Sequence, residues 1–201
     1  MATTATVLGA GARRAALGGV LGVGGFVSAW AIRGATRDGY SAVDDAISQL
    51  AASGAPARNW MTAGFLAFGI GVPVYAIALR KALSGPAWIT ATATGLCTLA
   101  VAAAPLGVAD TAHNVAAAAG YASLAATPLL AARQFRAQGD RAWAAWSLVA
   151  GIGSAVSLVV STSDTTHGLF QRLGLGFTDL WIIATALTMW RTGRLGSTPQ
   201  E

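Results

Sequence analysis

The residues that could carry out chemistry in this chain are few, and two short segments contain most of them. The segments Asp110–His113 and Asp164–His167 share an Asp-Thr-x-His pattern, and they contain the two histidines of the chain. In a helix this spacing places the carboxylate and the imidazole on one face, where Asp can orient His as a base. Asp and Thr before a helix are also ordinary N-cap residues, so the pattern fits two capped helix starts as well.

A divalent metal such as zinc is one interpretation of the repeated pattern. Its ligands would be His113, His167, Asp110 and Asp164, because two imidazoles with carboxylates are an acceptable though unspecific donor set. The single cysteine, Cys97, excludes a thiolate zinc cluster and an internal disulfide framework. The same four polar residues could instead form a catalytic pocket without a metal.

Two further ionisable residues extend this candidate pocket. Asp179 lies inside the last apolar stretch, where a carboxylate is costly and marks a functional or strongly paired position. Arg172 precedes it by seven residues and therefore lies on nearly the same helix face, so it could lean toward Asp179. Side chains or a water would have to bridge about 10 Å of helical rise. Both a structural pair and a working pair fit this pattern.

The composition decides the class of protein that must position these residues. Hydrophobic residues make up 54% of the 201 residues, charged residues only 10%, and the mean hydropathy is +0.56, whereas a soluble domain carries about 25% charged residues. This composition excludes a soluble globule, and it is the reverse of a disordered chain. We expect an all-α, polytopic integral protein of the cell membrane.

Six stretches approach the roughly 20 apolar residues that a membrane-spanning helix needs. They run approximately from Ala15 to Ile32, Trp60 to Leu79, Ala87 to Leu106, His113 to Ala132, Ala142 to Val160 and Leu169 to Trp190. The sequence thus predicts a six-transmembrane-helix bundle. The first stretch could instead be a cleaved signal peptide, because Arg13 and Arg14 precede it, but it is longer than the usual apolar region of a signal.

The basic residues predict how the helices are oriented. With alternating loops, nine of them lie on the side of the chain ends and four on the other side. The two groups are Arg13, Arg14, Arg80, Lys81, Arg133, Arg136, Arg141, Arg191 and Arg194, against Arg33, Arg37, Arg58 and Arg172. Both termini should therefore be cytoplasmic. This gives a cytoplasmic N-terminus over 1–14, a membrane domain over 15–192 with an outward loop over 34–59, and a cytoplasmic tail over 193–201.

The net charge of +5 could suggest a nucleic-acid partner. The basic residues flank apolar runs and do not form one face, so we expect membrane lipids and no nucleic acid as partners. No oligomeric state follows from the sequence. In the outward loop, Ser41-Ala42-Val43-Asp44 resembles a capping box, and Val43, Ile47 and Leu50 follow at helical spacing. We expect a short amphipathic helix there, lying on the membrane surface or folding over the bundle mouth.

Several segments together resemble the bacterial and archaeal membrane family called domain of unknown function 998. They are Asp44 to Leu50 with Gly54, Trp60 and Gly64, then Ala104 to Gly107 with Asp110 and His113, and Gly168 to Arg172 with Trp181. The sequence has Ala104 where the family pattern has Phe, and Asp110 is displaced from Pro105. The resemblance implies six helices and an important outer polar cluster, and it names no substrate.

Three functions remain open from the sequence. The first is a membrane component that binds a lipid or a lipid-linked group in an outward Asp/His pocket. The second is a membrane-embedded hydrolase or transferase, with or without a metal, in which a His–Asp pair activates water and Arg172 holds a phosphate or oxyanion. The third is a small proton-coupled transporter that uses Asp179, although a single deep charge disfavours it.

Overall fold

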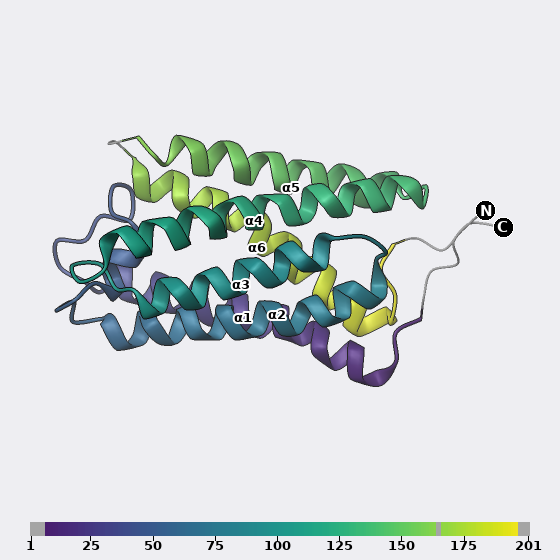
Figure 1. Cartoon of the computed structure of the whole chain (residues 1–201), viewed down its shortest axis with the longest axis horizontal. Coiled ribbons are helices and arrows are strands. Elements are labelled where there is room, and N and C mark those ends of the chain that lie inside the picture. The colour runs from purple at the N-terminus through teal and green to yellow at the C-terminus, as the bar shows by residue number, and fades with distance from the viewer. Residues whose placement is uncertain (1–6, 164–165, 197–201) are drawn as a thin grey trace.

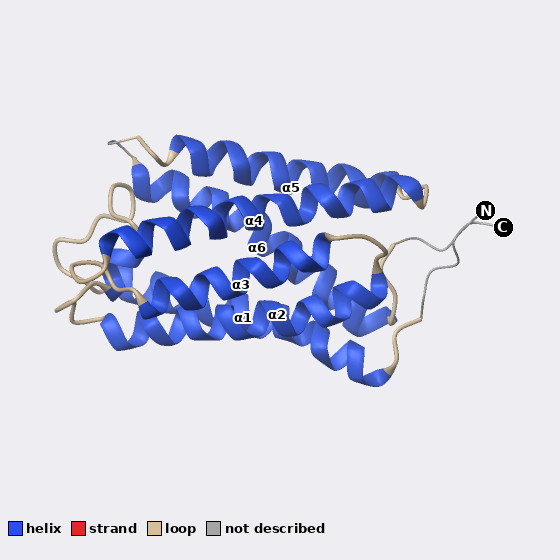
Figure 2. Cartoon of the chain, viewed as in Figure 1, coloured by secondary structure: helices blue, strands red, loops and turns tan. Residues whose placement is uncertain are grey.

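The computed structural model describes residues 7–163 and 166–196, and within them it contains helices and loops but no strand (Figures 1 and 2). The elements are α1 (Ala10–Ala35), the 3-10 helix η1 (Ile47–Ala51), α2 (Arg58–Ala82), α3 (Ala87–Ala103), α4 (Asp110–Ala137), α5 (Arg141–Val160) and α6 (His167–Thr192). The predicted stretches thus correspond one to one to the six long helices.

The six helices form a closed ring in chain order. Each packs against the next, and α6 packs back against α1. The helices alternate in direction, so α1 begins and α6 ends at the same end of the bundle (Figure 1). The connections after α1, α3 and α5 lie at the opposite end, which we call the loop end. That end therefore gathers the first long loop, the start of α4 and the start of α6.

Five helices are long and apolar enough to cross a membrane, and α3 is shorter, with 17 residues. The sequence predicted that this span would continue to Leu106, but α3 ends at Ala103. The residue before a proline is pushed out of the α region, and Ala104, which precedes Pro105, has φ −115° and ψ 74°.

Every long helix exposes large apolar side chains, for example Leu21, Ile70, Leu96, Val115 and Val159. An apolar surface of this extent is suited to lipid and not to water. Together with the long apolar helices, it gives the architecture of a polytopic helical membrane protein.

Glycines bring α1 and α2 into backbone contact. A Cβ atom on Gly18 would lie 2.5 Å from the carbonyl oxygen of Gly71, and one on Gly71 would lie 2.7 Å from the Cα of Gly22. Helices in a membrane associate through such close contact, because they gain no hydrophobic energy by leaving lipid.

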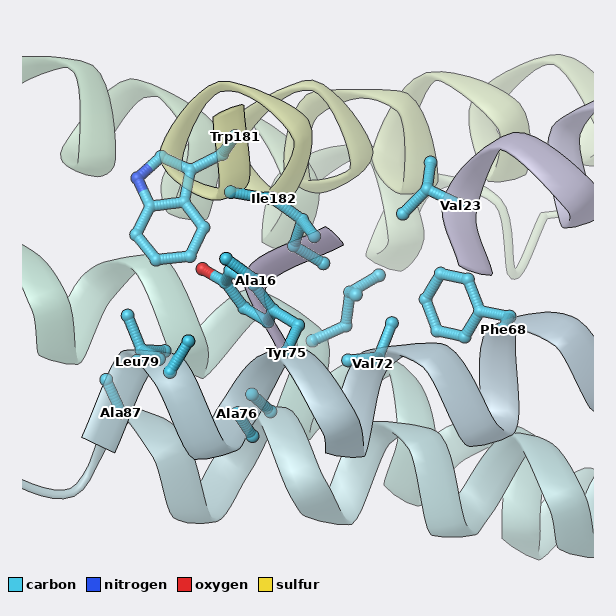
Figure 3. Close-up of a cluster of buried hydrophobic side chains, with 14 of the residues drawn as sticks. Ala16, Val23, Phe68, Val72, Tyr75, Ala76, Leu79, Ala87, Trp181 and Ile182 are labelled. Atoms are coloured by element: carbon cyan, nitrogen blue, oxygen red, sulfur yellow. The ribbon is translucent and has the colours of Figure 1, made fainter. Parts of the chain in front are cut away.

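Large side chains fill the centre of the ring between α1, α2 and α6 (Figure 3). Tyr75 and Trp181 are fully buried there, and the polar atom of each side chain is hydrogen bonded. The Tyr75 hydroxyl is hydrogen bonded to Thr185 at 2.8 Å, and the indole N–H of Trp181 donates to the Ser147 hydroxyl at 2.8 Å. Satisfied polar atoms of this kind avoid the cost of an unpaired group in a dry core.

Candidate functional site

The loop between α1 and α2 folds over the loop end of the bundle. Its five-residue helix η1 packs against α1, α2 and α6, and Ile47, Leu50 and Ala51 are buried. The predicted burial of Ile47 and Leu50 is thus found, whereas Val43 is exposed.

The short helix that we expected from Ser41 onward begins only at Ile47, and turns occupy the residues before it. The Ser41 hydroxyl donates to Asp44 at 2.7 Å, but the Ser41 backbone N–H donates to Asp45 at 2.7 Å, so these bonds close a turn. The following carbonyl groups are directed at α6: Val43 accepts from the backbone N–H of Leu169 at 2.8 Å. These carbonyl groups satisfy the start of α6 and are not available for a helix of their own.

Arg172 holds this loop in place. Its Nη1 donates to the carbonyl oxygens of Ala42 at 2.8 Å and Asp45 at 3.0 Å, and also to Gly168 in its own helix at 2.9 Å. Its Nη2 donates to the Tyr40 hydroxyl, and its guanidinium lies 5.3 Å from the centre of the Trp30 ring. The planar guanidinium is suited to bonding several acceptors in one plane while stacking on aromatic rings.

Tyr40 is part of the same clamp. Burial raises the pKa of its hydroxyl above the ordinary value of 10.0, and the neighbouring Arg172 offsets part of this rise. The neutral phenol is therefore the form that fits the docked loop.

A second contact joins the loop to α6 and α4. The side-chain oxygen of Gln171 accepts the backbone N–H of Ile47 at 2.8 Å, and its nitrogen donates to the Tyr121 hydroxyl. Gln171 is buried, with 4% of its surface exposed. One amide side chain therefore connects the loop, α6 and α4.

A cavity of about 570 Å³ lies beneath this loop, which we call the loop cavity. Its walls come from α2, α3, α4 and α6, with η1 above and one residue of α1, Phe26, beside it. The polar lining groups near the loop end include Gln49, His113, Asn114, His167 and Gln171. The deeper lining is mainly apolar, with Phe65, Phe68, Leu124 and Leu175, and its polar groups are already bonded: Thr94 and Thr98 donate to carbonyls of their own helix, and Tyr121 accepts from Gln171. The cavity thus has one polar end and one mainly apolar end.

Both histidines line the loop cavity, although they belong to different helices. The Nδ1 atom of His113 is 2.8 Å from the carbonyl oxygen of Ala104. A carbonyl can only accept, so Nδ1 carries the proton and Nε2 is left to accept a hydrogen bond or a second proton. His113 is buried, and His167 is half-buried at the first position of α6.

The carboxylate of Asp110 does not join this pair. Asp110 is exposed and accepts the backbone N–H of Gly107 at 2.7 Å, so it closes the turn before α4. It does not line the loop cavity. Asp164 lies outside the described residues. Within 7–163 and 166–196, no group of three or more His, Cys, Asp and Glu side chains is placed to hold a metal ion.

Asp179 and Arg172 line a different cavity. It measures about 390 Å³ and lies between α1 and α6, and we call it the side cavity. Asp179 is 4% exposed, and the expected pair with Arg172 does not form. The Arg172 guanidinium is directed to the loop, because helical side chains lean toward the N-terminus of their helix, away from a residue seven positions later. Ile47 and Leu175 line both cavities and separate them.

The sequence of the chain matches a known family. The family described as "Protein of unknown function (DUF998)" matches residues 20–188. The chain belongs to this family. Among the curated proteins and the solved structures, none matches. In this DUF998 member, two segments that carried the resemblance, Asp44 to Leu50 and Gly168 to Arg172, contact each other through Arg172 and Gln171.

Sequence reasoning missed Gln171, Tyr40 and Tyr121 as parts of the loop end. Gln171 was available as a signal, because an amide inside an apolar helix must find partners and here contacts two other elements. Tyr40 gave no such signal, because a tyrosine near a membrane boundary is common without any special role. Tyr121 lies well inside α4, where its hydroxyl, like the amide of Gln171, needs a partner.

Proposed function

We propose that this DUF998 member binds a lipid or a lipid-linked molecule in the loop cavity, with the polar group of the ligand beneath the loop. The observation that carries this proposal is the lining of the cavity, which is polar at one end and mainly apolar at the other. A volume of about 570 Å³ falls within the roughly 300–1,000 Å³ typical of small-molecule sites.

The depth of the cavity suits an acyl or prenyl chain. Along α4 its lining runs from His113 to Leu124, which corresponds to about 16 Å of helix at 1.5 Å per residue. That is about half of the 30 Å hydrocarbon layer. Each methylene group buried there would contribute about 0.8 kcal/mol. His113, His167 and Gln171 supply hydrogen-bonding groups for the head of the ligand.

We further infer that the loop end faces outward and that both termini are cytoplasmic. This inference rests on the nine-to-four distribution of basic residues given above. The ligand would then be drawn from the outer leaflet.

The proposal is tested by the lipid that remains on the protein after purification and delipidation. Ala117 lines the loop cavity, and Ala117→Phe should fill it and remove the bound lipid seen by mass spectrometry. Ala119→Phe is the matched control, because Ala119 is exposed on the same helix and does not line the cavity. Equal lipid content in both variants and in the unchanged protein would exclude the loop cavity as the site.

Cys97 gives a second test that needs no substitution. It is the only cysteine in the chain, it is half-buried, and it lines the loop cavity. A lysophospholipid added to delipidated protein should slow the reaction of this thiol with a maleimide. An unchanged rate at saturating lysophospholipid would contradict the proposal.

A hydrolase or transferase that acts on a lipid-linked substrate is the second candidate, and His113 favours it. The Ala104 carbonyl holds the proton on Nδ1, which leaves Nε2 as a general base at the polar end of the cavity. His113→Gln should then retain the bound lipid but abolish turnover of an ester or phosphodiester substrate. Zinc that co-purifies at one ion per chain and is lost in His167→Ala would favour the metal-dependent form of this candidate.

A further inference from the structure

The side cavity contains two buried polar atoms without partners. One carboxylate oxygen of Asp179 and the Nε atom of Arg172 make no hydrogen bond among the described residues. Both residues line this cavity. Asp179 is the more isolated of the two, because the Nη groups of Arg172 bond the loop. A buried carboxylate without a counter-charge is costly, so Asp179 either stays protonated or pairs with a cation that is not part of the described protein.

Two glycines make room for such a partner. Gly24 in α1 and Gly176 in α6 both line the side cavity, and a Cβ atom on either would meet nothing within 4 Å. Two nearby glycines behave differently: a Cβ atom on Gly25 would lie 2.9 Å from a neighbouring side chain, and one on Gly174 would lie 2.6 Å from one. Gly24 and Gly176 therefore widen the side cavity, whereas Gly25 and Gly174 allow close packing.

The walls and the rim of the side cavity decide which chemical class fits. Val23, Val27 and Ile183 give an apolar wall, and Leu180, which is 59% exposed, opens it to the lipid side. A divalent metal would need several oxygen or nitrogen ligands, and Asp179 is the one carboxylate in the lining. An anion would be repelled by ionised Asp179, a neutral amphiphile would meet only the protonated carboxyl, and a cation would pair with the carboxylate.

We propose that the side cavity binds a lipophilic organic cation, whose ammonium group pairs with Asp179 and whose apolar part lies against α1 and α6. Arg172 opposes this arrangement less than Asp179 favours it, because the ammonium group contacts Asp179 while the seven-residue separation places Arg172 about 10 Å away along the helix axis. Its guanidinium bonds the carbonyl oxygens of the loop. The ligand enters from the lipid between α1 and α6, so this site is independent of the loop cavity.

The experiment compares n-octylammonium with n-octanol, by calorimetric titration into protein reconstituted in nanodiscs of zwitterionic lipid. The two probes share a chain and differ in charge. We expect n-octylammonium to bind at least about tenfold more tightly than n-octanol, and Asp179→Asn to remove this preference while Asp38→Asn, in the exposed loop, retains it. Equal binding of the two probes, or an unchanged preference in Asp179→Asn, would overturn the proposal.

A second substitution leaves Asp179 intact, so the proposal can still be tested if Asp179→Asn does not fold. Gly176→Leu fills the side cavity and should weaken n-octylammonium binding by at least about tenfold, because its apolar part loses its place. Gly11→Leu is the matched control: Gly11 is exposed in α1, also has open space around a Cβ atom, and does not line the cavity. Undiminished binding in Gly176→Leu would refute the assignment to this cavity. We expect Ala117→Phe to lose the lipid of the loop cavity and still to bind n-octylammonium. This result would show that the two cavities bind their ligands independently.

Discussion

Arg172 should determine whether the loop stays closed over the bundle, and Arg172→Gln tests this directly. The guanidinium bonds two loop carbonyls, those of Ala42 and Asp45, and the Tyr40 hydroxyl. A hydrogen bond to a charged group contributes about 1.5–3 kcal/mol. Glutamine can recover one of the three bonds, so two are lost, and at the lower end of that range the docked loop is destabilised by about 3 kcal/mol.

Hydrogen exchange measured by mass spectrometry reports this opening. In the docked loop the backbone N–H of Asp45 donates to Ser41 and that of Ile47 donates to Gln171, both at 2.8 Å. Since 1.4 kcal/mol corresponds to a factor of ten, a loss of about 3 kcal/mol should speed exchange of the Ile47 amide about a hundredfold.

The control is Arg33→Gln, because Arg33 stacks on Trp60 at 5.0 Å near the same end of the bundle and is not part of the clamp. Its effect on the loop amides should stay within about fivefold, since a cation–π contact at an exposed site contributes about 0.5–1 kcal/mol. If the loop amides of Arg172→Gln exchange hydrogen at the same rate as those of the unchanged protein, Arg172 does not clamp the loop. Faster exchange throughout the helices would show instead that Arg172 stabilises the whole bundle.

Three other outcomes are expected. Gly168→Ala should open the loop as well, because its Cβ atom would lie 2.8 Å from a loop carbonyl oxygen, whereas Gly176→Ala should not; limited proteolysis of the loop compares the two. Loop docking should be constant below about pH 10 and weaken as the pH rises above it, because the docked loop favours neutral Tyr40; intrinsic fluorescence should follow this change, and Tyr40→Phe should abolish it. Reporter fusions after Ser53 and after Arg136 should report outside and inside respectively, and the same side for both would contradict the topology.

The helices themselves were predictable from the sequence, because their signal is local. Long apolar runs must become helices in lipid, where each backbone group needs an internal partner, and all six runs are helical in the structure. The end of α3 was placed at Leu106, three residues too late, because the effect of Pro105 on Ala104 was overlooked. Membrane class and family membership followed from the same local patterns.

The loop was only partly predictable, because its conformation depends on residues more than a hundred positions away. Ser41 and Asp44 have the local pattern of a capping box, and Ile47 is buried as its spacing suggested. The outcome at this loop depends on the start of α6, where Arg172 and the N–H of Leu169 attract the carbonyl groups that a helix would use. The spacing of residues within the loop cannot show whether its carbonyl groups bond to each other or to a distant helix.

The sequence by itself determined which residues could do chemistry, and the tertiary structure decided which of them meet. Composition alone makes His113, His167, Arg172 and Asp179 conspicuous, because polar groups are rare and costly in apolar helices. Closure of the helix ring brings the two histidines to one cavity and leaves Asp179 in another. The physical reason is that helix rotation and ring closure are fixed by packing between helices, including the glycine contacts of α1 with α2, which no spacing within one helix encodes.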